Sequence, residues 1–164
     1  RQNFAIVPLL PNKSLCVFSL TTLAVRVDVV GYFSATGGTH LSPSVVTRVT
    51  DTADTLQPLM NLGASANTIP AGTTHTLQLA GQRGLPADAK AVEVNVTASQ
   101  QSAAGTLTVW GGDCTVQPSV ATLSFPANTP VTNTAQVDLG TTGTLCVRST
   151  ASTRVTIDVH GWWN

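Results

Sequence analysis

The stretch NTAQVDLGTTGTLCVRSTASTRVTIDVHGWWN, residues 133–164, repeats a pattern already present in NFAIVPLLPNKSLCVFSLTTLAVRVDVVGYFS, residues 3–34. The two copies align without a gap at a constant offset of 130 residues, and 12 of the 32 aligned positions are identical. The identical residues of the second copy are Asn133, Ala135, Val137, Leu139, Leu145, Cys146, Val147, Ser149, Val155, Asp158, Val159 and Gly161. Because the period is that of one ordinary domain, we interpret residues 35–164 as one complete unit and residues 1–34 as the tail of a preceding unit.

Apolar and polar side chains alternate with a period of two through most of the chain. In Lys90–Ala98, for example, Val92, Val94 and Val96 fall on one face of an extended strand and polar residues fall on the other. No window shows a sustained stripe with the 3.6-residue period and the caps of a helix. The sequence therefore predicts an all-β chain with strands at Phe4–Leu10, Ser14–Ser19, Ala24–Phe33, Thr76–Ala80, Lys90–Ala98, Gly105–Trp110, Ser119–Phe125, Thr134–Leu139, Thr144–Ser149 and Arg154–Trp163.

Turns rich in glycine and proline separate these strands at short intervals, which is typical of a sandwich or barrel. We predict an antiparallel two-sheet sandwich of the immunoglobulin-like or jelly-roll type, used as a tandem-repeat module. Residues 35–69 look least regular, and we expect the unit boundary within the polar stretch Ser34–His40. The residues expected in the core are Val92, Val94, Val96, Leu107, Val109, Leu145, Val147, Val155, Ile157 and Val159.

Charged residues make up only 10% of the chain, and the eight basic and eight acidic side chains are scattered and sum to zero. Such a chain lacks the electrostatic footprint of a nucleic-acid partner, and we predict none. No apolar run approaches the roughly 20 residues of a membrane span, so membrane insertion is not expected. The polar surface is expected to consist mainly of serine, threonine, asparagine and glutamine, which suits exposed faces of strands.

The three cysteines, Cys16, Cys114 and Cys146, contain no CxxC pair and have no histidine cluster near them, so we predict neither a metal site nor another cofactor. Disulfide use in an oxidising compartment is the preferred interpretation. Cys114 and Cys146 sit beside strands of the same unit, and we predict that they are bonded to each other. Cys16 aligns with Cys146 and is then left without its natural partner.

Six stretches as a set resemble a repeated module of secreted actinobacterial proteins, whose units end in Asp-Val-x-Gly-Tyr-Phe. These stretches are Asp28–Phe33, Arg48–Thr52, Leu85–Thr97, Gly105–Trp110, Leu145–Val147 and Asp158–Trp162. In such proteins the units stand in tandem or beside hydrolase and protease domains, and the resemblance implies no catalytic role. The turns at residues 51–53 and 110–114 depart from the pattern of similar units.

Two sets of acidic residues are candidates for chemistry. Asp51 and Asp54, with the neighbouring threonines 52 and 55, offer oxygens of the kind that Ca²⁺ prefers, but their spacing is not that of a twelve-residue calcium loop. An aspartate that caps its own turn is the preferred interpretation. Asp28 and Asp158 recur at one position of the repeat, and we expect each to bond to a neighbouring turn rather than to act as an acid or base.

The histidines are His40, His75 and His160. A catalytic role needs a nucleophile or a metal placed beside the imidazole, and the sequence indicates neither. His160 aligns with Val30 of the other copy, so the repeat does not require a histidine there. We expect His160 to be a surface residue of a strand.

Trp110, Trp162 and Trp163 are the candidate ligand-binding residues, because flat aromatic faces stack on sugar rings. The last two align with Tyr32 and Phe33, which indicates that aromatic size matters at the end of that strand. Neighbouring strand residues point to opposite faces, so we expect one member of each pair in the core and the other exposed. Packing is preferred over a sugar platform.

These patterns together predict a non-catalytic extracellular module that acts by display, spacing or adhesion in a secreted, cell-surface or cell-wall protein. Its expected partners are neighbouring repeat units or copies of itself. A carbohydrate-binding module that uses exposed tryptophans, with a glycan as partner, is the alternative. An enzyme comes third, because no nucleophile elbow, zinc motif or paired-carboxylate pattern stands out.

The repeat supplies two tails, 3–34 and 133–164, but only one front, residues 35–132. Only one tail can occupy the place that the front provides, and three strands with an apolar face are barely stable alone. We therefore expect the surplus tail to be ordered and packed, either on a half-unit from a cleaved or neighbouring chain or as an extra sheet on the unit 35–164. The residues expected to be buried in this way are Phe4, Ile6, Leu15, Val25, Val27 and Val29.

Overall fold

The structure, a computed structural model, describes residues 4, 14–29, 32, 41–54 and 67–164. The strands are β1 (Leu41–Asp51), β2 (Thr74–Gln78), β3 (Ala91–Ser99), β4 (Gly105–Gly111), β5 (Leu123–Phe125), β6 (Val131–Asp138), β7 (Thr144–Ser149) and β8 (Arg154–Trp163). The all-β prediction is confirmed. Within the described ranges there is no helix long and apolar enough to span a membrane.

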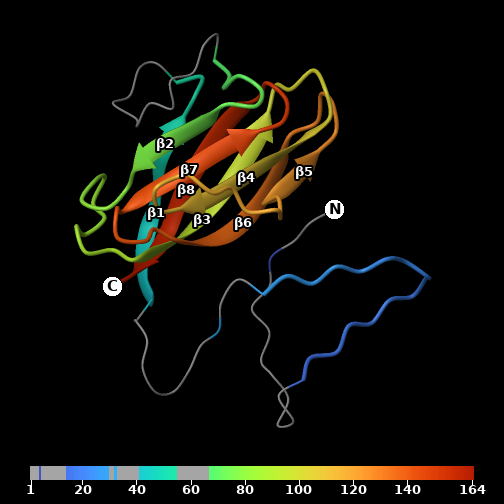
Figure 1. The fold of residues 1–164 in the computed structure, drawn as a ribbon, viewed down its shortest axis with the longest axis horizontal. Coiled ribbons are helices and arrows are strands. Elements are labelled where there is room, and N and C mark those ends of the chain that lie inside the picture. The colour runs from blue at the N-terminus through green and yellow to red at the C-terminus, as the bar shows by residue number, and fades with distance from the viewer. Residues whose placement is uncertain (1–3, 5–13, 30–31, 33–40, 55–66) are drawn as a thin grey trace.

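The strands form two four-stranded antiparallel sheets with the orders β1-β8-β3-β6 and β2-β7-β4-β5, and Figure 1 shows the second sheet in front of the first. Each strand of the first half pairs with one of the second half: β1 with β8, β2 with β7, β3 with β6 and β4 with β5. An immunoglobulin-like sandwich instead places its first and second strands side by side. The sandwich prediction is confirmed, and of the two types the strand order is that of an eight-stranded jelly roll.

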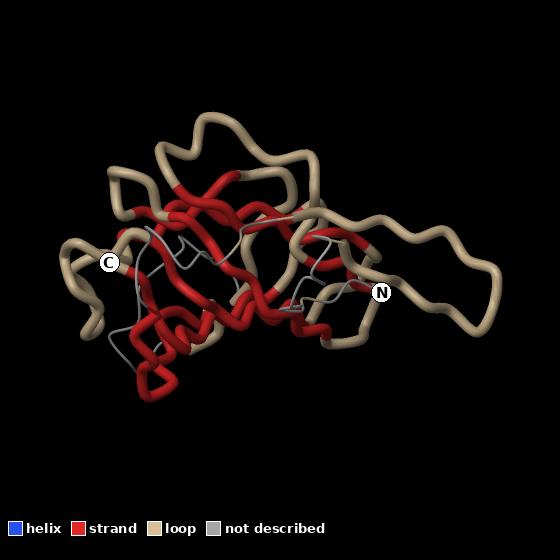
Figure 2. The backbone as a smooth tube through the Cα atoms, turned by 90° about the horizontal axis from the view of Figure 1, so that it is seen from below, coloured by secondary structure: helices blue, strands red, loops and turns tan. Residues whose placement is uncertain are grey.

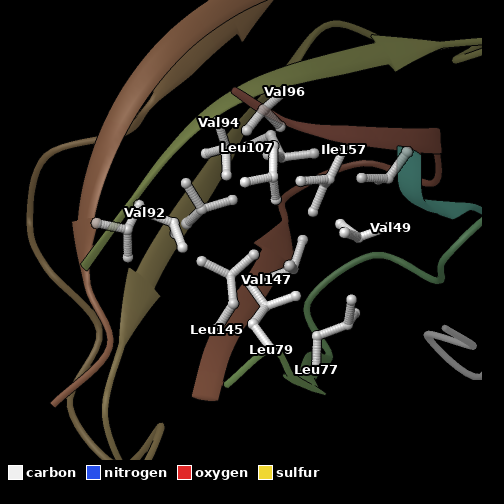
Figure 3. Packing of buried hydrophobic residues seen from close by; sticks show 14 of the residues in the cluster. Val49, Leu77, Leu79, Val92, Val94, Val96, Leu107, Leu145, Val147 and Ile157 are labelled. Carbon is white, nitrogen blue, oxygen red and sulfur yellow. The ribbon is translucent and has the colours of Figure 1, made fainter. Parts of the chain in front are cut away.

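The core lies between the two sheets and is built from the inward positions of the alternating strands (Figure 3). All ten residues predicted for the core are buried, none with more than 7% of its surface exposed. In β3, Val92, Val94 and Val96 are fully buried and alternate with half-buried polar residues. Burial of each such side chain contributes about 1.5 to 3 kcal/mol, so these positions hold the sheets together.

β1 corrects the expectation that residues 35–69 are irregular. It is an edge strand of 11 residues that pairs with β8 alone. Its register on β8 shifts twice, between Pro43 and Thr47 and again between Arg48 and Thr50. These irregularities break the period-two pattern, and a proline is tolerated because the strand is at an edge. The alternation in the sequence therefore did not predict β1, which is stabilised by its pairing with β8.

A third register shift lies in β8, where His160 is the extra residue between the pairs Glu93–Gly161 and Val94–Val159. Gly161 also lies against the start of β1, where a Cβ atom would stand 3.0 Å from the Leu41 Cδ1 atom and 3.0 Å from the Ser42 carbonyl oxygen. Only glycine lets β1 approach this closely without adjustment.

The described part of the leading tail, residues 14–29, forms no strand, although strands were predicted at Ser14–Ser19 and Ala24–Phe33. It is an extended loop that runs away from the sandwich in Figure 1 and projects beyond the strands in Figure 2. A lone strand pair is at best marginally stable in water, and the sandwich already contains its own β7 and β8. The strand predictions are therefore wrong over residues 14–19 and 24–29, and residues 30, 31 and 33 of the second predicted strand lie outside the described residues. The prediction for Phe4–Leu10 falls almost wholly outside the described residues.

Candidate functional site

Cys114 and Cys146 form a disulfide, as predicted, with their Cα atoms 5.5 Å apart and a sequence separation of 32. Cys146 lies in β7 on the face of its sheet that points away from the core. Cys114 belongs to the loop that follows β4, where Asp113 accepts hydrogen bonds from the backbone N–H and the hydroxyl of Thr115. These bonds hold the pKa of Asp113 below its usual value.

The loop that carries Cys114 lies over the outer face of the sheet β2-β7-β4-β5. Gln117 donates a hydrogen bond to the Thr108 hydroxyl of β4 over 3.3 Å and accepts one from Arg148 of β7 over 2.9 Å. The Val109 N–H donates to the Thr122 hydroxyl over 2.9 Å, where the loop returns to the sheet. The disulfide is thus one of several ties that keep the loop on the sheet.

Trp110 is buried beneath this disulfide-tied region rather than exposed. It lies directly opposite Cys146 in the β4–β7 pair, and only 7% of its surface is accessible. Its indole N–H is buried and has no hydrogen-bond partner among the described residues. Burial removes the open aromatic face that a sugar would need for stacking.

Trp162 and Trp163 correct the expectation that one is in the core and the other exposed. Trp163 is 7% exposed, and Trp162 is partly buried and packs against the core. The irregularity at Gly161 shifts the phase of the strand, so that Trp162 lies opposite the buried Val92. The role of the three tryptophans as ligand-binding residues remains a prediction, and none presents a fully open ring.

Four charged side chains form a cluster across β1 and β8 that sequence reasoning did not assemble. Arg154 donates from Nε and Nη2 to the two carboxylate oxygens of Asp51, over 2.8 and 2.7 Å. Arg48 donates in the same bidentate way to Asp158, over 2.8 and 3.1 Å, and its Nη1 lies 3.6 Å from Asp51. The outward positions of β8 were visible in the alternation, but their partners lay on the strand that the pattern missed.

This cluster revises both interpretations of the acidic residues. Asp51 does cap its own turn, because it accepts a hydrogen bond from the Ala53 N–H over 3.0 Å, but it also holds Arg154. Asp158 bonds to Arg48 on the neighbouring strand, so the expected bond to a neighbouring turn is wrong. The Arg154 hydrogen bonds hold the pKa of Asp51 below its usual value, against the opposing effect of burial. The same bonds raise the pKa of Arg154, and the bonds that Arg48 donates to Asp158 raise the pKa of Arg48.

We expect the ion pair of Asp51 with Arg154 to make the free energy of unfolding decrease at acidic pH. The pKa of Asp51 is lower in the folded state than in the unfolded chain, so its contribution is complete above the ordinary carboxyl value of about 4. It is lost as the pH falls through the lower folded-state pKa. Between pH 5 and pH 2, stability should therefore fall more steeply for the natural chain than for Asp51→Asn, measured by urea unfolding. Asp158→Asn breaks the more exposed pair and is expected to cost less stability at neutral pH. Parallel profiles for the natural chain and Asp51→Asn would refute this role.

The remaining polar candidates lie apart from one another. No group of three or more metal-ligating side chains occurs among the described residues. His75 in β2 and His160 in β8 are half-buried, and the buried Nε2 atom of each has no hydrogen-bond partner in the described part of the chain. His160 is therefore a strand residue, as expected, but it is only partly exposed, and it lies within the irregularity beside Gly161. His40 and Thr55 lie outside the described residues.

Most of the exposed large hydrophobic side chains of the described residues lie on the leading segment. Leu15, Val25, Val27 and Val29 have exposed fractions between 41% and 78%, and Ile6 lies outside the described residues. Phe4 is half-buried. These exposed residues therefore do not pack on the unit 35–164. The alternative in which the tail forms an extra sheet on that unit is wrong for them. Packing on a half-unit from another source remains a prediction.

No family model matches this chain, and no curated protein matches it significantly. Among solved structures, it is similar to a chain of the Tobacco streak virus coat protein dimer, with 14% sequence identity and a TM-score of 0.33. The match covers 78% of this chain and 90% of the coat protein chain. A likeness at this level carries no argument about function.

Proposed function

We propose that this chain is a non-catalytic structural module of a secreted or cell-surface protein, where it serves in spacing, display or adhesion. The observation that carries the proposal is a complete sandwich beside a second set of the same strand sequences. Residues 41–54 and 67–164 contain all eight strands, including their own β6, β7 and β8. Residues 3–34 repeat the sequence of those three strands and are surplus to this sandwich. A tandem array of such units, as in the actinobacterial proteins that the sequence resembles, accounts for both.

Two further observations support this proposal. The Cys114–Cys146 disulfide suits an oxidising compartment, which is where such bonds persist. The candidate carboxylates Asp51 and Asp158 are each engaged by an arginine in a bidentate pair between β1 and β8. Side chains held in this way stabilise strand pairing and are poor candidates for proton transfer.

The location is tested on intact cells that produce the full-length protein. An antibody against the sandwich is expected to label intact cells or to detect the chain in the medium, and external protease should remove the cell-bound signal. A cytoplasmic marker protein in the same cells is the control. Recovery of the chain only in the fraction that contains this marker would contradict the proposed setting.

A glycan array separates the structural module from the carbohydrate-binding alternative. We expect no concentration-dependent binding of the full chain, because the rings of Trp110 and Trp163 are buried. Saturable binding that is lost in Trp162→Ala while the melting temperature is retained would favour the alternative. Trp162 is the informative position, since it is the least buried of the three.

A further inference from the structure

We propose that residues 3–34 provide the β6, β7 and β8 strands of a second sandwich, whose strands β1 to β5 come from the front half of another unit of this kind. The inference rests on the proposed structural role and names the partner that it requires. Its template is this chain itself, because the structure shows what residues 133–164 contact when a front half is present. Strand addition of this type gains main-chain hydrogen bonds from the sheet edge and specificity from the side chains that enter the core.

The apolar side chains of the segment match inward positions of β7 and β8. The counterparts of Leu15, Val17, Val25, Val27 and Val29 are Leu145, Val147, Val155, Ile157 and Val159. Each counterpart has at most 1% of its surface exposed, whereas each residue of the leading segment has at least 41% exposed. The segment therefore carries the side chains of a core without the core, and the front half of a unit is what supplies that core.

Asp28 supplies a first point of charge complementarity. It aligns with Asp158, which lies opposite Arg48 and binds it with two hydrogen bonds. In the leading segment the ion pair of Asp28 within the described residues is with the exposed Arg26, at 3.6 Å. A front half with an arginine at the position of Arg48 would give Asp28 the bidentate partner that its counterpart has.

Arg26 supplies a second point. In this sandwich Asp51 receives Arg154, whose position in the leading segment is taken by Ala24. Arg26, however, aligns with the β8 residue that lies directly opposite Asp51. The carboxylate at the Asp51 position would therefore meet an arginine in both sandwiches, Arg154 in this one and Arg26 in the second. The charges of Arg26 and Asp28 on the segment are complementary to those of Asp51 and Arg48 on β1.

Cys16 supplies a third, covalent point. It is an exposed free thiol, and it aligns with Cys146, which is bonded to Cys114. In the second sandwich the Cys16 thiol would join the thiol at the Cys114 position of the incoming front half. A small disulfide such as oxidised glutathione takes up the two electrons and two protons and is reduced to two thiols, while the new S–S bond forms by thiol–disulfide exchange.

The test uses the full chain and, as probe, a tagged polypeptide of residues 35–130, which carries β1 to β5 and Cys114 but lacks β6, β7 and β8. The two are refolded together by dilution from denaturant in a glutathione buffer. Light scattering on the eluted protein should show a complex of one full chain with one probe. Non-reducing peptide mapping should show Cys16 of the full chain bonded to Cys114 of the probe.

Two neighbouring substitutions provide the matched comparison. Val17→Arg places a charge at the position of Val147, which is fully buried, and should abolish the complex. Phe18→Arg introduces the same residue at the position of Arg148, which is outward, and should retain the complex. Both lie outside the eight strands, so the melting temperature of the sandwich should be unchanged in each.

Three results would overturn the inference: no complex with the natural chain, equal capture of the probe by Val17→Arg, or a complex whose disulfide excludes Cys16. A stable dimer of the full chain that needs residues 1–34 but no probe would also overturn it, in favour of a second complete copy as partner. If the association with the probe fails, the proposal of a secreted structural module still stands. If the chain is found only in the cytoplasm, the result of the association experiment is unaffected. The two proposals therefore fail independently.

Discussion

Replacing both cysteines of the disulfide, in Cys114→Ser/Cys146→Ser, is expected to lower the free energy of unfolding by about 3 to 4 kcal/mol. The bond closes a loop over a sequence separation of 32, and the chain-entropy estimate for a loop of that size lies in this range. Urea unfolding with matched slopes measures the loss. Because the loop after β4 would lose one of its ties to the sheet, the fluorescence of the buried Trp110 should also shift toward that of an exposed indole.

Cys16→Ser is the control for this prediction, because Cys16 is a free and exposed thiol in the leading segment. It should leave the free energy of unfolding of the sandwich unchanged. A chemical reductant added to the natural chain should reproduce the loss seen in the double variant. A loss below about 1 kcal/mol in the double variant would mean that the hydrogen bonds of Gln117 and Thr122 hold the loop without the disulfide.

Gly111→Ala is expected to destabilise the sandwich by about 3 kcal/mol or more. Gly111 ends β4 where that strand meets the end of β6, and an added Cβ atom would collide with the Asp138 carbonyl oxygen and stand 2.8 Å from the Leu139 Cα atom. Both neighbours are backbone, so relief requires the two sheets to move apart, and overpacking of this kind is costly. Thermal unfolding should show a fall in the melting temperature of about 10 °C.

Gly112→Ala is the matched comparison at the next residue. An added Cβ atom there meets nothing within 4 Å, but the backbone has a φ of +99°, so the cost is conformational and about 1 kcal/mol. The contrast isolates steric contact from backbone strain. Equal losses for the two variants would show that the approach of β4 to β6 is not what requires a glycine.

Period-two alternation was sufficient to predict most of the sandwich. It placed β3, β4, β6, β7 and β8 close to their observed bounds and assigned all ten predicted core residues correctly, because inward and outward positions of a half-buried strand differ in solvent contact. The disulfide was predictable because both cysteines sit beside strands of one unit. β5 was predicted too long, with only Leu123–Phe125 of Ser119–Phe125 paired.

Positions beside irregularities were not predictable. The register shifts along β1 hid that strand, and with it the partners of Asp51 and Asp158. The shift at Gly161 reversed the phase of the strand end, so that Trp162 packs against the core, while Trp163 on the other face is also only 7% exposed. A register shift is decided by the fit between two strands, and a pattern read along one strand does not contain it.

The sequence by itself determined that this chain holds two copies of one strand pattern, with the same inward valines and leucines at the same spacing. Only the tertiary structure decided that one copy is β6, β7 and β8 of a jelly roll and that the described part of the other copy, residues 14–29, is an exposed extended loop. The physical reason is that a strand is stable only when a neighbouring strand takes up its backbone hydrogen bonds and a core covers its apolar face. Strands β1 to β5 provide that edge and that core once, and β6, β7 and β8 occupy them.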